Sequence, residues 1–122
     1  MKSLILFLSI LFGCSSINVL SAQTQVKNET IKVWGNCGSC KKHIEKAAKT
    51  AGAKTAVWNE DSKILALSYN TTKTSSQKIQ QSIADVGYDT QDFKGNKSAY
   101  DKLDKCCRYD RKDAAASTQK NQ

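Results

Sequence analysis

Residues 30–52 read TIKVWGNCGSCKKHIEKAAKTAG and contain the clearest local structure signals of the sequence. The first part, 30–34, alternates and is rich in β-branched and aromatic side chains, which predicts a strand. From 40 to 51 the apolar side chains recur at helical spacing, and Gly52 is placed to end that helix. The loop 35–39 joins the two elements. The stretch therefore predicts a strand and a helix with a Cys-x-x-Cys loop at their junction.

The two cysteines of this loop, Cys37 and Cys40, are predicted to lie at the N-terminus of the helix. Unpaired backbone N–H groups give that end a partial positive charge, which lowers thiol pKa values, and Lys41 and Lys42 add to it. Gly38 allows the tight turn that lets two sulfurs converge. Thiolates select soft ions such as Cu(I) and Zn(II) over hard cations. Cys37 and Cys40 are therefore candidate ligands of a soft metal ion.

The chain after this helix predicts a hairpin, a second helix and a last strand. Two strand-like runs are joined by a polar turn, which is typical of a hairpin. Thr74 and Gln77 form a capping-box pair at the start of the second helix, and Gly87 is its predicted end. The predicted elements are strands at 54–58 and 63–69, a helix between Thr74 and Gly87, and a strand at 88–93.

The resulting order is β-α-β-β-α-β between residues 28 and 94. This order predicts an α+β fold, a ferredoxin-like sandwich with an antiparallel sheet and two helices on one face. About 100 residues follow the N-terminal apolar run, which is enough for one domain but not for two.

Residues 95–122 are predicted to form a C-terminal appendage. Ser98 is expected to cap a short helix there, and the end beyond Asp113 is expected to be disordered. The appendage carries Cys106 and Cys107, which as neighbours are too strained to pair readily with each other. Three roles stay open for them: disulfides to the first cysteine pair, extra thiolates in a three- or four-sulfur metal site, or an independent or intermolecular function.

Residues 1–22 have the layout of a secretory signal peptide, a short positive start followed by the apolar run 4–12. That run is too short to span a bilayer as a helix. Two processing routes stay open, cleavage near Ala22 or lipidation of Cys14 at a lipobox-like site. We expect a bacterial protein that is periplasmic or secreted, and membrane-associated only if Cys14 is lipidated.

The charge pattern and the single histidine limit other functions. The formal net charge is +8, but basic and acidic residues are interspersed, so no nucleic-acid partner is expected. Lys42, Lys46 and Lys49 form either a solvated helix face or a docking surface for an acidic partner. His43 is either an exposed helix residue or an auxiliary metal ligand. One histidine and no catalytic triad give no reason to expect an enzyme.

Residues 30–92 resemble the heavy-metal-associated domain of copper chaperones, metal-transporting ATPases and periplasmic mercury-binding proteins. The resemblance is carried by the Cys37-Gly38-Ser39-Cys40 loop after a strand, Ile44-Glu45-Lys46-Ala47, Gly52, the hairpin and Gly87-Tyr88-Asp89. It implies that Cys37 and Cys40 ligate a solvent-accessible ion of low coordination number and that Tyr88 packs beside it. The chain departs from the usual Gly-Met-Thr before the first cysteine, because Trp34-Gly35-Asn36 stands there.

The same resemblance implies a carrier that passes metal by thiolate exchange to a metal-transporting ATPase or another metal-receiving protein. Cu(I) is the expected metal ion, and Zn(II) and Hg(II) are the alternatives. No acidic residue directly precedes Cys37, which disfavours zinc.

A thioredoxin-like thiol-disulfide oxidoreductase is the alternative, because Trp34 precedes Cys-Gly-Ser-Cys-Lys. Thioredoxin-like sites share a cis-proline loop that lies beside the dithiol. The chain has no proline, and a cis peptide without proline costs about 3 kcal/mol. The sequence therefore favours the metal carrier.

Overall fold

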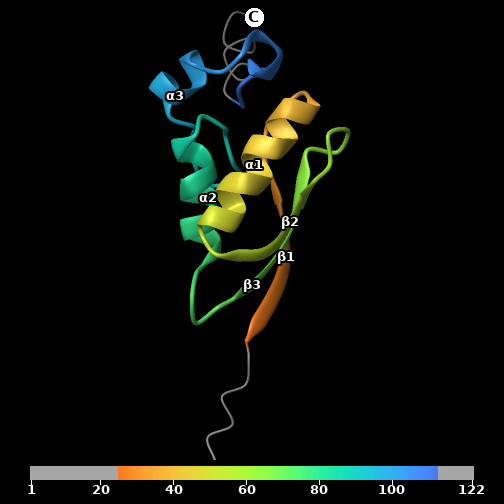
Figure 1. The fold of residues 1–122 in the computed structure, drawn as a ribbon, viewed down its shortest axis with the longest axis vertical. Helices are drawn as coiled ribbons and strands as arrows, with labels where there is room; N and C mark the ends of the chain where they lie inside the picture. Colours follow the sequence, from red (N-terminus) through yellow and green to blue (C-terminus); the bar gives the residue numbers. More distant parts are fainter. Residues whose placement is uncertain (1–24, 113–122) are drawn as a thin grey trace, which may run out of the picture.

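A computed structural model describes residues 25–112, and Figure 1 shows their arrangement. The elements are β1 (Val26–Lys32), α1 (Gly38–Thr50), β2 (Ala53–Trp58), β3 (Ile64–Asn70), α2 (Ser76–Asp85), α3 (Lys97–Asp101) and the 3-10 turn η1 (Lys105–Cys107). No helix within this described range is long and apolar enough to cross a membrane. The predicted signal peptide, Cys14 and the predicted disordered end lie outside the described residues.

The three strands form one antiparallel sheet in the order β1-β3-β2, and α1 and α2 lie together on one of its faces (Figure 1). Strand side chains alternate between two faces, so every second residue of β3 points toward the helices. Those residues, Leu65, Leu67 and Tyr69, are buried, as are Ile44 of α1 and Ile79 of α2. This arrangement confirms the predicted ferredoxin-like α+β class.

The predicted last strand at 88–93 is reduced to one bridge between Val33 and Thr90. The Thr90 N–H donates to the carbonyl of Phe93 at 2.8 Å, which turns the chain away from the sheet. The Asp89 N–H donates to the hydroxyl of Tyr109 at 2.7 Å. Because these backbone donors are used in a turn and by the appendage, no ladder continues past the bridge.

The helix ends follow the predicted glycines but not the predicted caps. Gly52 and Gly87 have φ values of +106° and +101°, in the left-handed region that suits glycine after a helix. Ser75, not Thr74, caps α2 by accepting from the Lys78 N–H. Thr74 instead donates to the carbonyl of Ala51 at 2.6 Å, which ties the start of α2 to the end of α1.

The appendage folds back toward the N-terminal end of α1, as the blue segment of Figure 1 shows. We call residues 97–112 the C-terminal strap. Its first helix, α3, is capped by Asn96, which accepts from the Ala99 N–H, so the prediction of Ser98 as the cap was wrong. The Tyr109 ring stacks on Tyr88 with centroids 5.6 Å apart. The strap is therefore packed against the domain rather than extended from it.

Candidate metal centre

The Cys-x-x-Cys loop begins α1, as predicted. Cys37 is the N-cap residue of α1 with an extended backbone, and Cys40 lies in the first helical turn. The two sulfurs are 3.4 Å apart, and the Cys40 thiol donates to Asn36 Oδ1 at 3.2 Å. Cys40 is buried, whereas Cys37 is half-buried and the two residues between them are exposed. The loop therefore presents one accessible and one inaccessible sulfur.

The buried Trp58 side chain packs against the backbone that leads into this loop. Its indole N–H donates to the carbonyl of Val33 at 3.0 Å, and its ring is buried. A Cβ built on Gly35 would lie 3.0 Å from that ring and 3.2 Å from the Cys40 Cβ, so only glycine fits there comfortably. The tryptophan at the end of β2 thus fixes the backbone that leads into the cysteines.

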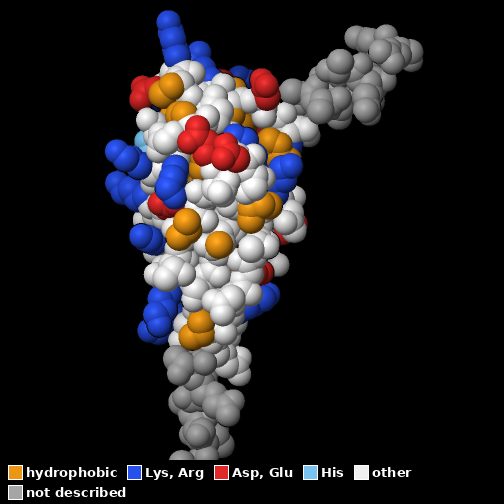
Figure 2. Space-filling view, turned by 90° about the vertical axis from the view of Figure 1, so that its right-hand side faces the viewer, with side chains coloured by type: hydrophobic (Ala, Val, Ile, Leu, Met, Phe, Trp, Pro, Cys, Tyr) orange, Lys and Arg blue, Asp and Glu red, His pale blue; other side chains and the backbone are white. Residues whose placement is uncertain are grey.

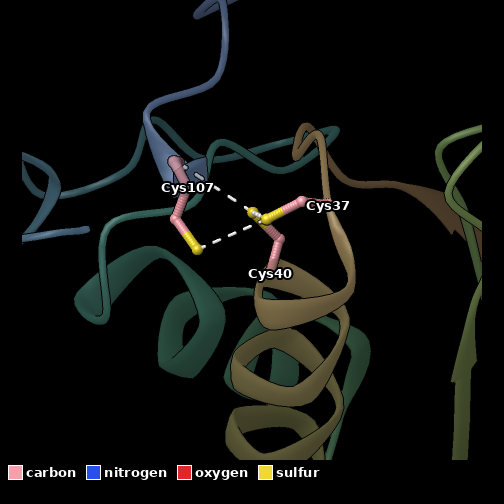
Figure 3. Close-up of side chains that lie close together, drawn as sticks. All are labelled: Cys37, Cys40 and Cys107. Atoms are coloured by element: carbon pink, nitrogen blue, oxygen red, sulfur yellow. Dashed lines mark hydrogen bonds between the residues drawn. The ribbon is translucent and has the colours of Figure 1, made fainter. Parts of the chain in front are cut away.

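A third sulfur completes the cluster, as Figure 3 shows. Cys107 Sγ lies 3.6 Å from Cys37 Sγ, and the three sulfurs of Cys37, Cys40 and Cys107 all lie within 4.8 Å of one another. Cys107 is fully buried, whereas Cys106 is exposed, although their sulfurs are 3.9 Å apart. All four cysteines in the described range are free thiols. The structure thus brings one member of the second pair to the site.

The thiols differ in their readiness to ionise. Burial alone raises the pKa of Cys37. Hydrogen bonds to its sulfur outweigh burial and lower this pKa to about 7; their donors are the backbone N–H of Cys40, the Cys40 and Cys107 thiols and the backbone N–H of Ser39. Burial, followed by the neighbouring Cys40 and Cys37 thiols, raises the pKa of Cys107 well above its ordinary value. Of these two sulfurs, Cys37 is therefore the one that becomes thiolate first near neutral pH, as expected at a helix N-terminus.

Tyr88 lies beside the cluster, as the family resemblance implies. Its ring is fully buried, and burial, followed by the Cys40 and Cys107 sulfurs, raises its pKa. Its hydroxyl is 2.9 Å from Nδ1 of His43. His43 itself is exposed and is not among the clustered ligand atoms of residues 25–112, so the geometry does not support an auxiliary ligand role.

The charged side chains divide between local pairing and open surface. Lys41 is paired with Glu45 and also donates to the carbonyl of Trp58 at 3.1 Å, so its ammonium group is partly neutralised by contacts within the domain. Lys42, Lys46 and Lys49 are exposed along α1. On the face drawn in Figure 2, acidic side chains lie among the Lys and Arg side chains rather than apart from them.

Sequence reasoning did not identify the groups that hold the third sulfur in place. Tyr109 donates its hydroxyl to the carbonyl of Gly87 at 2.6 Å, and Tyr100 donates to the carbonyl of Tyr109 at 2.8 Å. Arg111 forms an ion pair with the fully buried Asp89 at 2.6 Å. The only sequence signal was the cluster of tyrosines and arginines around the second cysteine pair, which defines no contact by itself.

Comparisons with known proteins agree with this geometry. The family model of the heavy-metal-associated domain matches residues 30–89. A solved CopZ metallochaperone is similar at 29% identity and a TM-score of 0.50, covering 52% of this chain and 98% of that chain. A protein of Bacillus anthracis str. Ames that is proposed to bind copper ions shares the fold at 24% identity and a TM-score of 0.53, covering 56% and 99%. No curated protein matches the chain. Residues 30–89 are therefore a heavy-metal-associated domain.

Proposed function

We propose that this protein is a soft-metal carrier that binds Cu(I) through Cys37 and Cys40 and passes it on by thiolate exchange. The observation that carries the proposal is the pair of sulfurs 3.4 Å apart at the N-terminus of α1. The family match and the likeness to a CopZ metallochaperone support it.

The unequal exposure of the two sulfurs suits transfer. Cys37 is half-buried and Cys40 fully buried, so an incoming thiolate reaches the ion from the Cys37 side. One thiolate of the partner forms a bond to the ion as the bond from Cys37 breaks, and a second partner thiolate then replaces Cys40 in the same way, so the ion ends on the partner. The oxidation state of the ion does not change, and the released Cys37 and Cys40 sulfurs take up protons from solvent. The exchange needs no oxidant or reductant.

The donor set favours a soft ion of low coordination number. Structural Zn(II) sites usually have four protein ligands. The cluster found among residues 25–112 offers three sulfurs and no carboxylate or imidazole. Cu(I) therefore fits better than Zn(II), and Hg(II) is the remaining alternative because thiolates favour soft ions generally.

The setting of the carrier follows from sequence features. The predicted signal peptide supports export to the periplasm or the medium, with Cys14 lipidation as the route to a membrane. The receiving protein is a metal-transporting ATPase or another metal-receiving protein. The exposed lysines of α1, Lys42, Lys46 and Lys49, support docking on an acidic surface near the loop.

A carrier rather than an enzyme is proposed. The thioredoxin-like alternative rested on the Trp34 and Cys-x-x-Cys order alone. The sheet order β1-β3-β2 and the family match belong to the heavy-metal-associated domain, so no observation favours the oxidoreductase.

The test is the metal content and free-thiol count of the full-length protein purified without reductant. We expect stoichiometric copper with the thiols reduced. The matched control is the Cys37→Ser/Cys40→Ser double variant, which should retain the fold by circular dichroism and carry no copper. A natural protein without metal and with two disulfides would refute the proposal.

A further inference from the structure

We infer that Cys107 is a third thiolate ligand, so that the C-terminal strap closes the Cys37 and Cys40 site into a three-sulfur metal centre. The inference rests on the proposed function, because it assigns a further ligand to the same ion. It also selects one of the two appendage cysteines and leaves Cys106 outside the site.

The sulfur separations fit three-coordination better than two-coordination. With metal–sulfur bonds of about 2.3 Å, planar three-coordination places sulfurs about 4.0 Å apart and linear two-coordination about 4.6 Å apart. Cys37 Sγ lies 3.4 Å from Cys40 Sγ and 3.6 Å from Cys107 Sγ. Each of these distances is closer to the three-coordinate value, so binding needs only a small outward movement of each sulfur.

The position of Cys107 is fixed by contacts on the C-terminal side of the strap. Tyr109, two residues on, stacks on Tyr88 and hydrogen-bonds to the carbonyl of Gly87 at 2.6 Å. Arg111 pairs with the buried carboxylate of Asp89, and the Lys112 N–H donates to the same carboxylate at 3.1 Å. These buried contacts lie next to Tyr88, so the strap is attached where the domain faces the cluster.

The N-terminal side of the strap is attached just as closely. A Cβ on Gly87 would lie 2.7 Å from the Tyr100 nitrogen, so the strap backbone packs directly on the end of α2. Tyr100 forms an edge-on contact with Tyr109, with centroids 5.2 Å apart. Held from both sides, Cys107 cannot leave the cluster without breaking several buried contacts.

Cys106, the residue next to Cys107, differs from it in burial and in the position of its sulfur. It is exposed, and its sulfur is not in the group of ligand atoms formed by Cys37, Cys40 and Cys107. Cys107 is fully buried and its carbonyl lies 3.9 Å from the Cys40 sulfur. The two residues therefore form a matched pair for a test, with the same chemistry one position apart.

The chemistry of binding balances without any redox step. Each of the three thiols loses its proton to solvent and forms one bond to the ion, which keeps its oxidation state. A third internal thiolate occupies the coordination position that a partner's thiolate would take. The strap must therefore move, or the Cys107 bond must break, before the ion is transferred.

The test loads the reduced full-length protein with Cu(I) without oxygen and compares natural protein, Cys107→Ser and Cys106→Ser. X-ray absorption should give three sulfur neighbours for the natural protein and for Cys106→Ser, and two for Cys107→Ser. Competition with a chromophoric Cu(I) chelator should show affinity about 10- to 100-fold lower for Cys107→Ser, a loss at least as large as that from an outer-shell change. Cys106→Ser should stay within about twofold of the natural protein.

The outcomes separate the inference from the proposed function. Two sulfur neighbours in the natural protein, or equal affinity and coordination in Cys107→Ser, would overturn the third ligand and leave the carrier intact. Failure of the natural protein to bind Cu(I) would overturn both. The coordination number of the natural protein decides the question even if Cys107→Ser does not fold, which circular dichroism reports.

Discussion

The first cysteine pair places both of its sulfurs at the site, whereas the second pair places only that of Cys107 there. Cys37 and Cys40 are three residues apart at the start of α1, so one helical turn brings their sulfurs within 3.4 Å. Cys106 and Cys107 are neighbours in η1, and their sulfurs face different surroundings, one exposed and one buried. The comparison teaches that local spacing is enough to build a two-sulfur site, whereas a third sulfur depends on tertiary contacts.

The largest expected effect tests the local pair against the distant one. Replacing Cys40 by Ser should weaken Cu(I) binding more than Cys107→Ser does, because it removes the buried sulfur of the Cys-x-x-Cys loop and leaves only Cys37 and Cys107 as ligands. Replacing Cys106 by Ser should leave binding unchanged, because that thiol is exposed. Metal analysis after gel filtration measures the copper bound by both variants. An equal loss of copper in the two variants would show that the two cysteine pairs contribute equally to binding.

The next largest effect is on the attachment of the strap. Arg111→Met leaves the fully buried Asp89 without its ion-pair partner. Breaking such a pair costs about 3 kcal/mol or more of unfolding free energy. The control is Lys105→Met, which removes one exposed charge from the same strap and should cost less than about 0.5 kcal/mol. Urea unfolding measures both, and similar values for the two variants would show that the ion pair does not hold the strap.

The same ion pair predicts a pH dependence of stability. Burial alone raises the pKa of Asp89, but Arg111 and the backbone N–H groups of Gly95 and Lys112 outweigh it and lower this pKa. A carboxyl whose pKa is lowered by folding stabilises the protein above its unfolded pKa of about 3.9, and this stabilisation is lost as the pH falls through the folded value. Urea unfolding between pH 6 and pH 2 should show that loss. In Arg111→Met the acid-dependent part should be smaller, and an unchanged acid profile would assign it to other groups.

The smallest expected effect concerns the ionisation of the accessible sulfur. Alkylation of the reduced, metal-free protein by iodoacetamide should modify Cys37 with a midpoint near pH 7, the pKa that its hydrogen bonds produce. Cys107 should react later than Cys37, because it is buried and its pKa is raised. Cys107→Ala removes a hydrogen bond that lowers the pKa of Cys37, so the midpoint should rise. Peptide mass mapping follows each site, and an unchanged midpoint would show that the two sulfurs do not interact in the metal-free protein.

The elements that the sequence predicted correctly are those with local signals. The helix of α1 has apolar residues at helical spacing, and Gly52 ends it with a positive φ, so a short window contains the whole signal. The Cys37 and Cys40 pair belongs to the same window. The predicted cap of α2 was wrong by one residue because Thr74 and Ser75 both carry hydroxyls, and only the contact of Thr74 with Ala51 separates them.

The parts that could not be predicted depend on residues far apart in the chain. The predicted strand at 88–93 has the right composition, yet the Asp89 N–H is taken by Tyr109, twenty residues on. The third sulfur lies 70 residues after Cys37, and its place is set by the Arg111 and Asp89 pair. No periodicity or spacing rule reports such contacts, so the sequence left three roles open for the second cysteine pair.

The 3.6 Å approach of Cys37 and Cys107 also has a topological consequence. An ion bonded to both sulfurs cross-links two points 70 residues apart in the sequence and so closes a loop through most of the domain. By the chain-entropy estimate used for disulfides, a loop of this size stabilises the folded state by about 4 kcal/mol. Unlike a disulfide, this cross-link is removed whenever the ion leaves. The loaded carrier is therefore the more stable form, and delivery of its cargo returns the chain to a looser state.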